Sequence, residues 1–124
     1  MAKVEIRVIR KLFYPELAEH YLAEGKAAGP CPLLAEGDVF VYEGDAEMPK
    51  GLCPWAWIDI YRGVSALAAG AATPWYRNNG QEIFCCTDGV RPVVFALTAL
   101  PEETENESPR IANERLSEKM VRIT

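Results

Sequence analysis

The feature that most restricts the fold of this chain is a long helical pattern from Pro54 to about Ala69, which contains only two charged residues, Asp59 and Arg62. Apolar side chains recur along it at the three- and four-residue spacing of a helix: Trp57, Ile60, Tyr61, Val64, Leu67 and Ala68. A helix with so few charges around its circumference must be covered on most sides. We therefore expect this helix to lie at the centre of the domain or in a subunit interface.

Four other segments have the pattern of β-strands. Residues Lys3–Arg10 alternate apolar and charged side chains, which is typical of a half-buried strand. Short apolar runs bounded by turns predict the other strands: Val39–Tyr42, 82–86 and 91–97. A shorter N-terminal helix is expected to begin at Pro15 and to end before Gly25. This order predicts an α+β fold, in which a small, mostly antiparallel sheet of about four strands packs on the long apolar helix.

The chain has 124 residues, a length that suits one domain. After Leu100 the composition changes to a polar segment with two prolines and many acidic residues. We expect residues 1–100 to form a single α+β domain and residues 101–124 to form a polar C-terminal tail, with a short helix from Ile111 to Met120.

The composition argues against several classes of partner. The formal net charge of −5 argues against nucleic acid and against anionic membrane surfaces. No stretch approaches the roughly 18 consecutive apolar residues of a membrane span, and the charged N-terminal residues do not have the pattern of a signal peptide. We therefore expect a cytoplasmic protein. In that reducing compartment the four cysteines are expected to be free, metal-bound or catalytic.

The Asp-Gly pair at 88–89 predicts a β-hairpin whose register is restricted by Pro92. A two-residue turn would place Pro92 at a hydrogen-bonded position of the ladder, where proline has no N–H to donate. A four-residue loop, 87–90, avoids this conflict and pairs Cys86 with Arg91. The two side chains would then share one face, where a guanidinium favours the reactive thiolate. We therefore predict Cys86, supported by Arg91, as a reactive thiol.

The other cysteines differ in their predicted surroundings. Cys85 is expected on the opposite face of the strand from Cys86, as a packing residue, because side chains alternate. Cys53 precedes Pro54, and a proline at the first helical position places Cys53 at the N-cap, near the positive end of the helix dipole. Cys31 lies between two prolines, in a loop with a stiff backbone. We therefore take Cys53, Cys86 and Cys31, with Arg91, as the candidate thiol site.

Metal binding is an alternative role for Cys31, Cys53 and Cys86, with zinc or an iron–sulfur cluster as the cofactor. The chain has no Cys-x-x-Cys pair, which zinc sites usually contain, and its single histidine, His20, excludes a His-rich centre. A further alternative is that the cysteines are structural, because free cysteine is among the most buried residue types.

Three residues are secondary candidates: Asp88, Asp59 and Trp57. Asp59 and Arg62 have the spacing of an intrahelical ion pair, and the alternative for Asp59 is a buried acid beside tryptophan. Trp57 suits either the core or a ligand cage.

Three blocks of the sequence, GPCPL, GLCPWAWIDIY and CCTDGVRPVVF, resemble the motifs of a small family of uncharacterised prokaryotic proteins. In that family Gly-Pro-Cys-Pro, Cys-x-Trp-Ala-Trp and Cys-Cys-x-Asp-Gly-x-Arg-Pro blocks occur in this order. The resemblance extends from the first strand to about Leu100, and the tail is not part of it. It implies a domain boundary, and it implies no activity, substrate or cofactor.

Together these features predict a thiol-site protein that binds a small-molecule ligand or a soft metal, or carries out thiol redox chemistry. The alternative is a non-catalytic oligomeric scaffold or interaction module with structural cysteines. A third hypothesis is an enzyme that uses Asp59 or Asp88 as an acid–base group. Residues 91–97 are apolar on both faces of their predicted strand, so we also expect a homo-oligomer in which the second face of the sheet meets another subunit.

Overall fold

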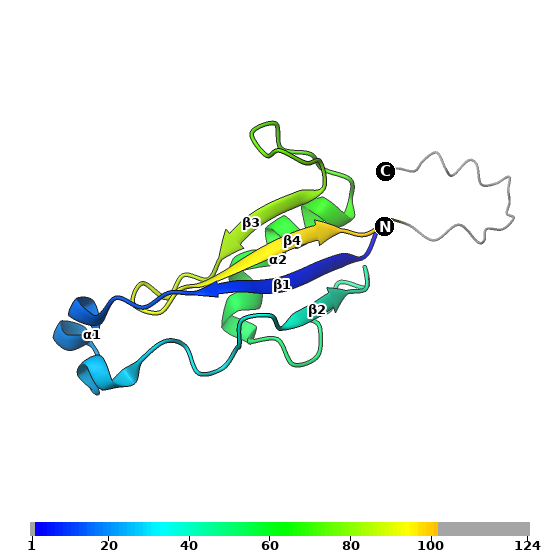
Figure 1. Cartoon of the computed structure of the whole chain (residues 1–124). Coiled ribbons are helices and arrows are strands. Elements are labelled where there is room, and N and C mark those ends of the chain that lie inside the picture. The colour runs from blue at the N-terminus through cyan, green and yellow to red at the C-terminus, as the bar shows by residue number, and fades with distance from the viewer. Residues whose placement is uncertain (1, 102–124) are drawn as a thin grey trace, which may run out of the picture.

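The computed structural model describes residues 2–101. Its elements are, in chain order, β1 (Val4–Lys11), α1 (Pro15–Tyr21), the 3-10 helix η1 (Gly25–Ala28), β2 (Val39–Tyr42), α2 (Pro54–Ala68), β3 (Gln81–Cys85) and β4 (Val93–Ala99). The prediction of an α+β chain with a four-stranded antiparallel sheet and two α-helices is confirmed (Figure 1). Almost all of the predicted tail, including the helix predicted from Ile111 to Met120, lies outside the described residues. Between residues 2 and 101, no helix has the length and apolar character that crossing a membrane requires.

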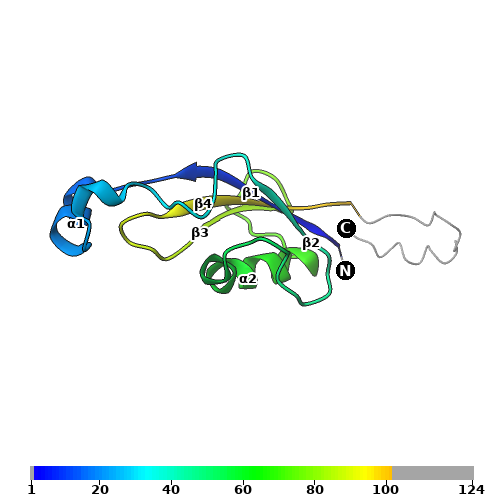
Figure 2. The ribbon, with the colours of Figure 1, turned by 90° about the horizontal axis from the view of Figure 1, so that it is seen from below.

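The strands form one sheet in the order β2-β1-β4-β3, and every neighbouring pair is antiparallel. α2 lies across one face of this sheet, whereas α1 and η1 lie beyond the end of β1 (Figure 1, Figure 2). Alternation along the strands sends apolar side chains toward α2, and the core contains Val4, Ile6, Val8, Val93, Phe95 and Leu97 packed with Ile60, Val64 and Leu67. Within the described part of the chain, the opposite face of the sheet has no helix over it.

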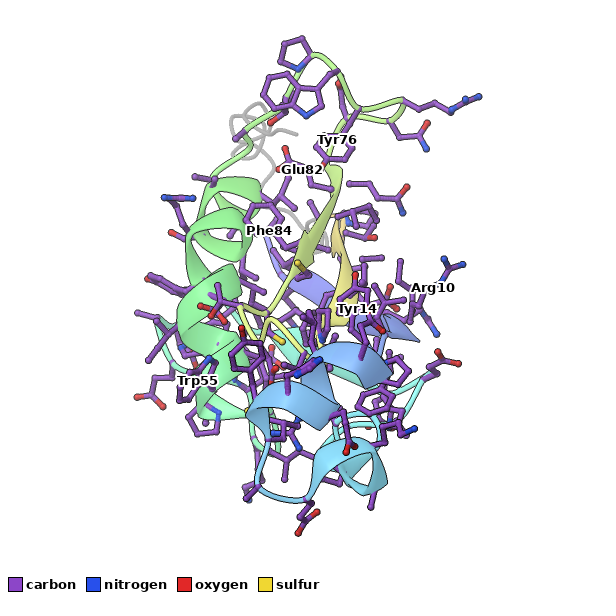
Figure 3. All side chains as sticks on the ribbon, turned by 90° about the vertical axis from the view of Figure 1, so that its left-hand side faces the viewer. Arg10, Tyr14, Trp55, Tyr76, Glu82 and Phe84 are labelled. Atoms are coloured by element: carbon purple, nitrogen blue, oxygen red, sulfur yellow. The ribbon has the colours of Figure 1, made fainter. Side chains whose placement is uncertain are left out.

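α2 approaches β3 closely at Gly63, which is buried in the middle of the helix. A Cβ atom at this position would lie 2.7 and 2.8 Å from Cε1 and Cε2 of Phe84, inside ordinary van der Waals contact. The Phe84 side chain lies between β3 and α2 (Figure 3). Because Gly63 has no side chain, the ring of Phe84 can fill the space between helix and sheet.

A β-bulge in β1 changes which side chains face α2 near the end of the strand. Val8 pairs with Phe95, but Arg10 pairs with Val94, so Ile9 is the extra residue on β1. Lys11 pairs with Val93 and therefore shares the buried face of the sheet with it. The bulge thus turns a lysine, Lys11, toward the same side of the sheet as the core.

The β3–β4 hairpin differs from the predicted register. The backbone N–H of Cys86 donates to the carbonyl of Val93 at 3.0 Å, in line with the ladder of β3 and β4. The prediction that Cys86 pairs with Arg91 is therefore wrong, and the loop has six residues, 87–92, instead of four. The longer loop places Pro92 outside the ladder, so its missing N–H removes no cross-strand hydrogen bond.

Candidate functional site

Three of the four cysteines line one pocket of about 390 Å³, which we call the thiol pocket. They come from three separate segments: Cys31 from the loop after η1, Cys53 from the residue before α2, and Cys86 from the residue after β3. The full lining is Cys31, Pro32, Leu33, Leu34, Cys53, Trp55, Ala56, Cys86, Asp88, Arg91 and Val93. Five candidates that the sequence singled out separately, the three cysteines with Asp88 and Arg91, therefore share one cavity.

Cys53 occupies the N-cap of α2, as predicted, and Pro54 is the first residue of the helix. The carbonyl of Cys53 accepts a hydrogen bond from the N–H of Trp57 at 2.9 Å, which begins the helical pattern. The thiol makes no capping hydrogen bond to the N–H groups of the first turn. Cys53 therefore presents a half-buried thiol to the pocket beside the helix N-terminus, where the helix dipole is positive.

Cys86 is buried, and its side chain is fixed by the neighbouring strand. Its Sγ accepts a hydrogen bond from the backbone N–H of Val93 at 3.3 Å. Cys85 is exposed, which agrees with the predicted alternation of the two adjacent cysteines. The expectation that Cys85 is a packing residue is wrong, because its side chain lies on the uncovered face of the sheet.

Asp88 folds the hairpin loop around its own carboxylate. Oδ1 accepts hydrogen bonds from the backbone N–H groups of Val90 and Arg91, both at 2.9 Å, and Oδ2 accepts one from Nε of Arg91 at 3.4 Å. Burial alone would raise the pKa of Asp88, but these N–H groups and the Arg91 charge outweigh burial and hold the pKa below its ordinary value. Arg91 thus lines the same pocket as Cys86, although the two residues are not cross-strand partners.

The first turns of α2 hold the hairpin loop at Thr87. Oδ2 of Asp59 accepts hydrogen bonds from the backbone N–H of Thr87 at 2.8 Å and from its hydroxyl at 3.0 Å. Trp55 lies at the same end of α2 (Figure 3), and its indole N–H donates to the Thr87 hydroxyl oxygen at 3.3 Å. The ion pair expected between Asp59 and Arg62 is absent from residues 2–101, because Asp59 binds the loop instead.

The hairpin loop is also attached to the segment that follows β1. The N–H of Leu12 donates to the carbonyl of Pro92 at 2.8 Å, and the N–H of Tyr14 donates to the carbonyl of Val90 at 3.0 Å. The loop is therefore held from two sides, by α2 and by the chain between β1 and α1.

Lys11 connects the sheet to the Cys31 side of the pocket. Its Nζ donates to the carbonyl of Leu34 at 2.7 Å, and its backbone N–H donates to a carboxylate oxygen of Glu36 at 3.0 Å. Leu34 is buried and lines the pocket. This contact fixes the pocket wall that carries Cys31 and places a positive charge behind it.

Trp57 does not line the pocket. Its ring packs against Tyr61 and Tyr42, with ring centroids 5.0 and 5.7 Å away, so the structure places it in an aromatic cluster beside the core. The metal alternative also lacks a ligand set, because no three His, Cys, Asp or Glu side chains between residues 2 and 101 are grouped to hold a metal ion.

Sequence reasoning missed several residues that build the site: Lys11, Leu33, Leu34, Trp55 and Thr87. The sequence could have indicated Trp55 as a site residue, because Trp55 lies in the first helical turn after the Cys53 N-cap. Nothing in the sequence indicated Lys11, because an unbroken alternation along the strand would have placed it on the other face of the sheet.

No family model matches this chain, and no match was found among curated proteins or solved structures. The resemblance based on the three cysteine blocks therefore stays a prediction.

Proposed function

We propose that this chain is a thiol-site protein that binds a small, mainly apolar molecule in the thiol pocket. The observation that carries the proposal is the convergence of Cys31, Cys53 and Cys86, from three distant segments, on one cavity. Most of the other lining residues are apolar, as is typical of small-molecule sites with a few polar groups that fix orientation. Among the roles expected of the thiols, this lining supports ligand binding best.

Within this function the thiols have different roles. Cys31 and Cys53 are both half-buried in the lining, and Cys53, at the N-terminus of α2 without a capping hydrogen bond, is the thiol that we take to contact the ligand. Cys86 is buried and accepts the Val93 N–H, so it acts as a fixed part of the wall. All four cysteines are free thiols, which supports the further proposal of a reducing, cytoplasmic location.

A second candidate function, an oligomeric scaffold, is supported by the uncovered face of the sheet. One cross-strand row on this face contains Ile83, Ala96, Arg7 and Val39, and both Ile83 and Val39 are 43% exposed. We propose that this face meets a second copy of the chain. Light scattering should then give a dimer or larger species, and Ile83→Glu should give a monomer.

Selective thiol labelling tests the pocket. The folded protein is treated with N-ethylmaleimide or with the larger, more apolar N-phenylmaleimide, and peptide mass spectrometry follows Cys53 relative to Cys85. Cys85 is exposed outside the pocket, and at a protein concentration low enough for light scattering to give the monomer it serves as an internal reference for the intrinsic reactivity of each reagent. An apolar pocket should raise the Cys53 to Cys85 ratio severalfold for the phenyl reagent.

The matched control is the same measurement in urea, where the pocket is lost and the two reagents should give the same ratio. An equal ratio for both reagents in the native protein would contradict the proposal.

A further inference from the structure

We propose that the thiol pocket selects a small organic anion, in which one carboxylate is attached to an apolar body. This inference rests on the proposed ligand-binding function and adds the charge of the ligand to it. The apolar body has a matching wall, because Leu33, Leu34, Trp55, Ala56 and Val93 all line the cavity. The carboxylate needs a positively charged donor at the same cavity, and Arg91 provides one.

Arg91 keeps most of its guanidinium donors available. Its side chain is 32% exposed, and it lines the pocket. Among the hydrogen bonds within residues 2–101, Nε is the only guanidinium nitrogen that donates, to Asp88 at 3.4 Å, a distance longer than ordinary N–H···O bonds. The two Nη groups therefore remain as a planar pair of donors, the geometry that binds a carboxylate through two parallel hydrogen bonds.

Among the described residues that line the pocket, Arg91 is the one cation and Asp88 is the one carboxylate. Lys11 is not part of the lining, but its Nζ places a positive charge behind the pocket wall, at the carbonyl of Leu34. The nearby acids are engaged with backbone N–H groups: Asp88 and Asp59 accept from the hairpin loop, and Glu36 accepts from the N–H of Lys11. A carboxylate ligand therefore meets the Nη donors of Arg91, while the Asp88 carboxylate is held by the loop N–H groups and by Nε of Arg91.

The N-terminus of α2 also favours an anionic ligand, although the inference rests on the cavity and on Arg91. Trp55 and Ala56, in the first turn, line the pocket. That turn contains no acidic residue, and the thiol of Cys53 does not cap it. The positive end of the helix dipole is therefore not offset by a side chain of this turn.

A matched pair of probes tests the charge preference. Phenylacetate and phenylacetamide have nearly the same size and shape, and only the first is an anion. Each is titrated against the rate at which N-ethylmaleimide modifies Cys53, with Cys85 as the internal reference. Phenylacetate should protect Cys53 at about five- to tenfold lower concentration, as expected for a partly exposed guanidinium–carboxylate contact. Added salt should weaken protection by phenylacetate and leave phenylacetamide unchanged.

Variants assign the preference to Arg91. Arg91→Gln should abolish it, Arg91→Lys should retain part of it, and Arg62→Gln, which removes an exposed arginine of α2 outside the pocket, should leave it unchanged. Equal protection by the two probes in the wild-type protein would overturn the anion preference and leave the pocket function standing. Failure of both probes to protect Cys53 would overturn the ligand-binding function as well. Where Arg91→Gln does not fold, the salt titration of the wild-type protein still tests whether the preference for phenylacetate is electrostatic.

Discussion

Cys86 and Val93 are joined by two hydrogen bonds of different kinds at the last residue pair of the β3–β4 hairpin. The N–H of Cys86 donates to the carbonyl of Val93 at 3.0 Å, and the N–H of Val93 donates to Sγ of Cys86 at 3.3 Å. The sulfur thus satisfies a buried backbone donor and lines the thiol pocket at the same time. This contact explains why one of two adjacent cysteines is part of the architecture and the other is not.

Replacement of Cys86 by alanine should destabilise the protein by about 1–2 kcal/mol, because it leaves the Val93 N–H without its acceptor and opens a small cavity. Urea unfolding measures the change in the free energy of unfolding. Cys85→Ala is the matched control, since Cys85 is exposed, and it should lie within about 0.5 kcal/mol of the wild type. Equal losses for the two variants would show that the Val93 contact contributes nothing.

The contact of Asp59 with Thr87 should couple α2 to the hairpin loop. Asp59→Ala removes the acceptor of two hydrogen bonds, one from the Thr87 backbone and one from its hydroxyl, and should cost about 1–2 kcal/mol. Thr87→Val removes only the hydroxyl, so a double-mutant cycle should give a coupling energy of about 0.5–1 kcal/mol. Arg62→Ala, on the same helix, should be nearly neutral. A large effect of Arg62→Ala that depends on Asp59 would instead support the intrahelical ion pair.

Most of the element positions could be predicted because their signals are local. The bounds of β2, Val39–Tyr42, agree with the apolar run between two turns, and α2 begins at Pro54 as the proline position predicts. The N-cap position of Cys53 follows from the same proline. These features depend on neighbours in sequence, which is the information that a pattern contains.

The hairpin register and the pocket could not be predicted, because they depend on distant partners. The absence of an N–H in Pro92 is compatible with a four-residue and with a six-residue loop. The structure has the longer loop, which is held by Leu12, Tyr14 and Asp59, residues far from it in the sequence. Lys11 likewise reaches the pocket side of the sheet only through the bulge at Ile9, and simple alternation does not contain that bulge.

Acid should remove the stabilisation that Asp88 provides. The pKa of Asp88 lies below its ordinary value of 3.8 in the folded protein, so the folded chain binds this proton more weakly than the unfolded chain does. The stabilisation is therefore complete above about pH 5 and is lost as the pH falls below about 4 and through the folded pKa. Thermal unfolding of the wild type and of Asp88→Asn should differ by a constant amount at neutral pH, and the difference should shrink below about pH 4. A difference that does not change between pH 7 and pH 3 would contradict this role.

The close contact between Gly63 and Phe84 determines whether Gly63→Ala stabilises or destabilises the protein. Helix propensity alone would predict the wrong direction. Alanine in the middle of a helix is favoured over glycine by about 1 kcal/mol, so Gly63→Ala would stabilise an isolated α2. In this fold the added methyl group would meet the Phe84 ring at less than 3.0 Å, and overpacking of this kind costs about 1–3 kcal/mol. We therefore expect Gly63→Ala to lower the free energy of unfolding in urea.

Two further variants test that explanation. Phe84→Leu combined with Gly63→Ala should lose less stability than the sum of the single changes, because the smaller side chain makes room for the methyl group. Gly89→Ala is the control, since a Cβ there has no atom within 4 Å, and it should lie within about 0.5 kcal/mol of the wild type. If Gly63→Ala proves as stable as the wild type, α2 must be able to move away from β3. In that case the position of the helix, and with it the wall of the thiol pocket that α2 provides, is adjustable and not fixed by the Phe84 contact.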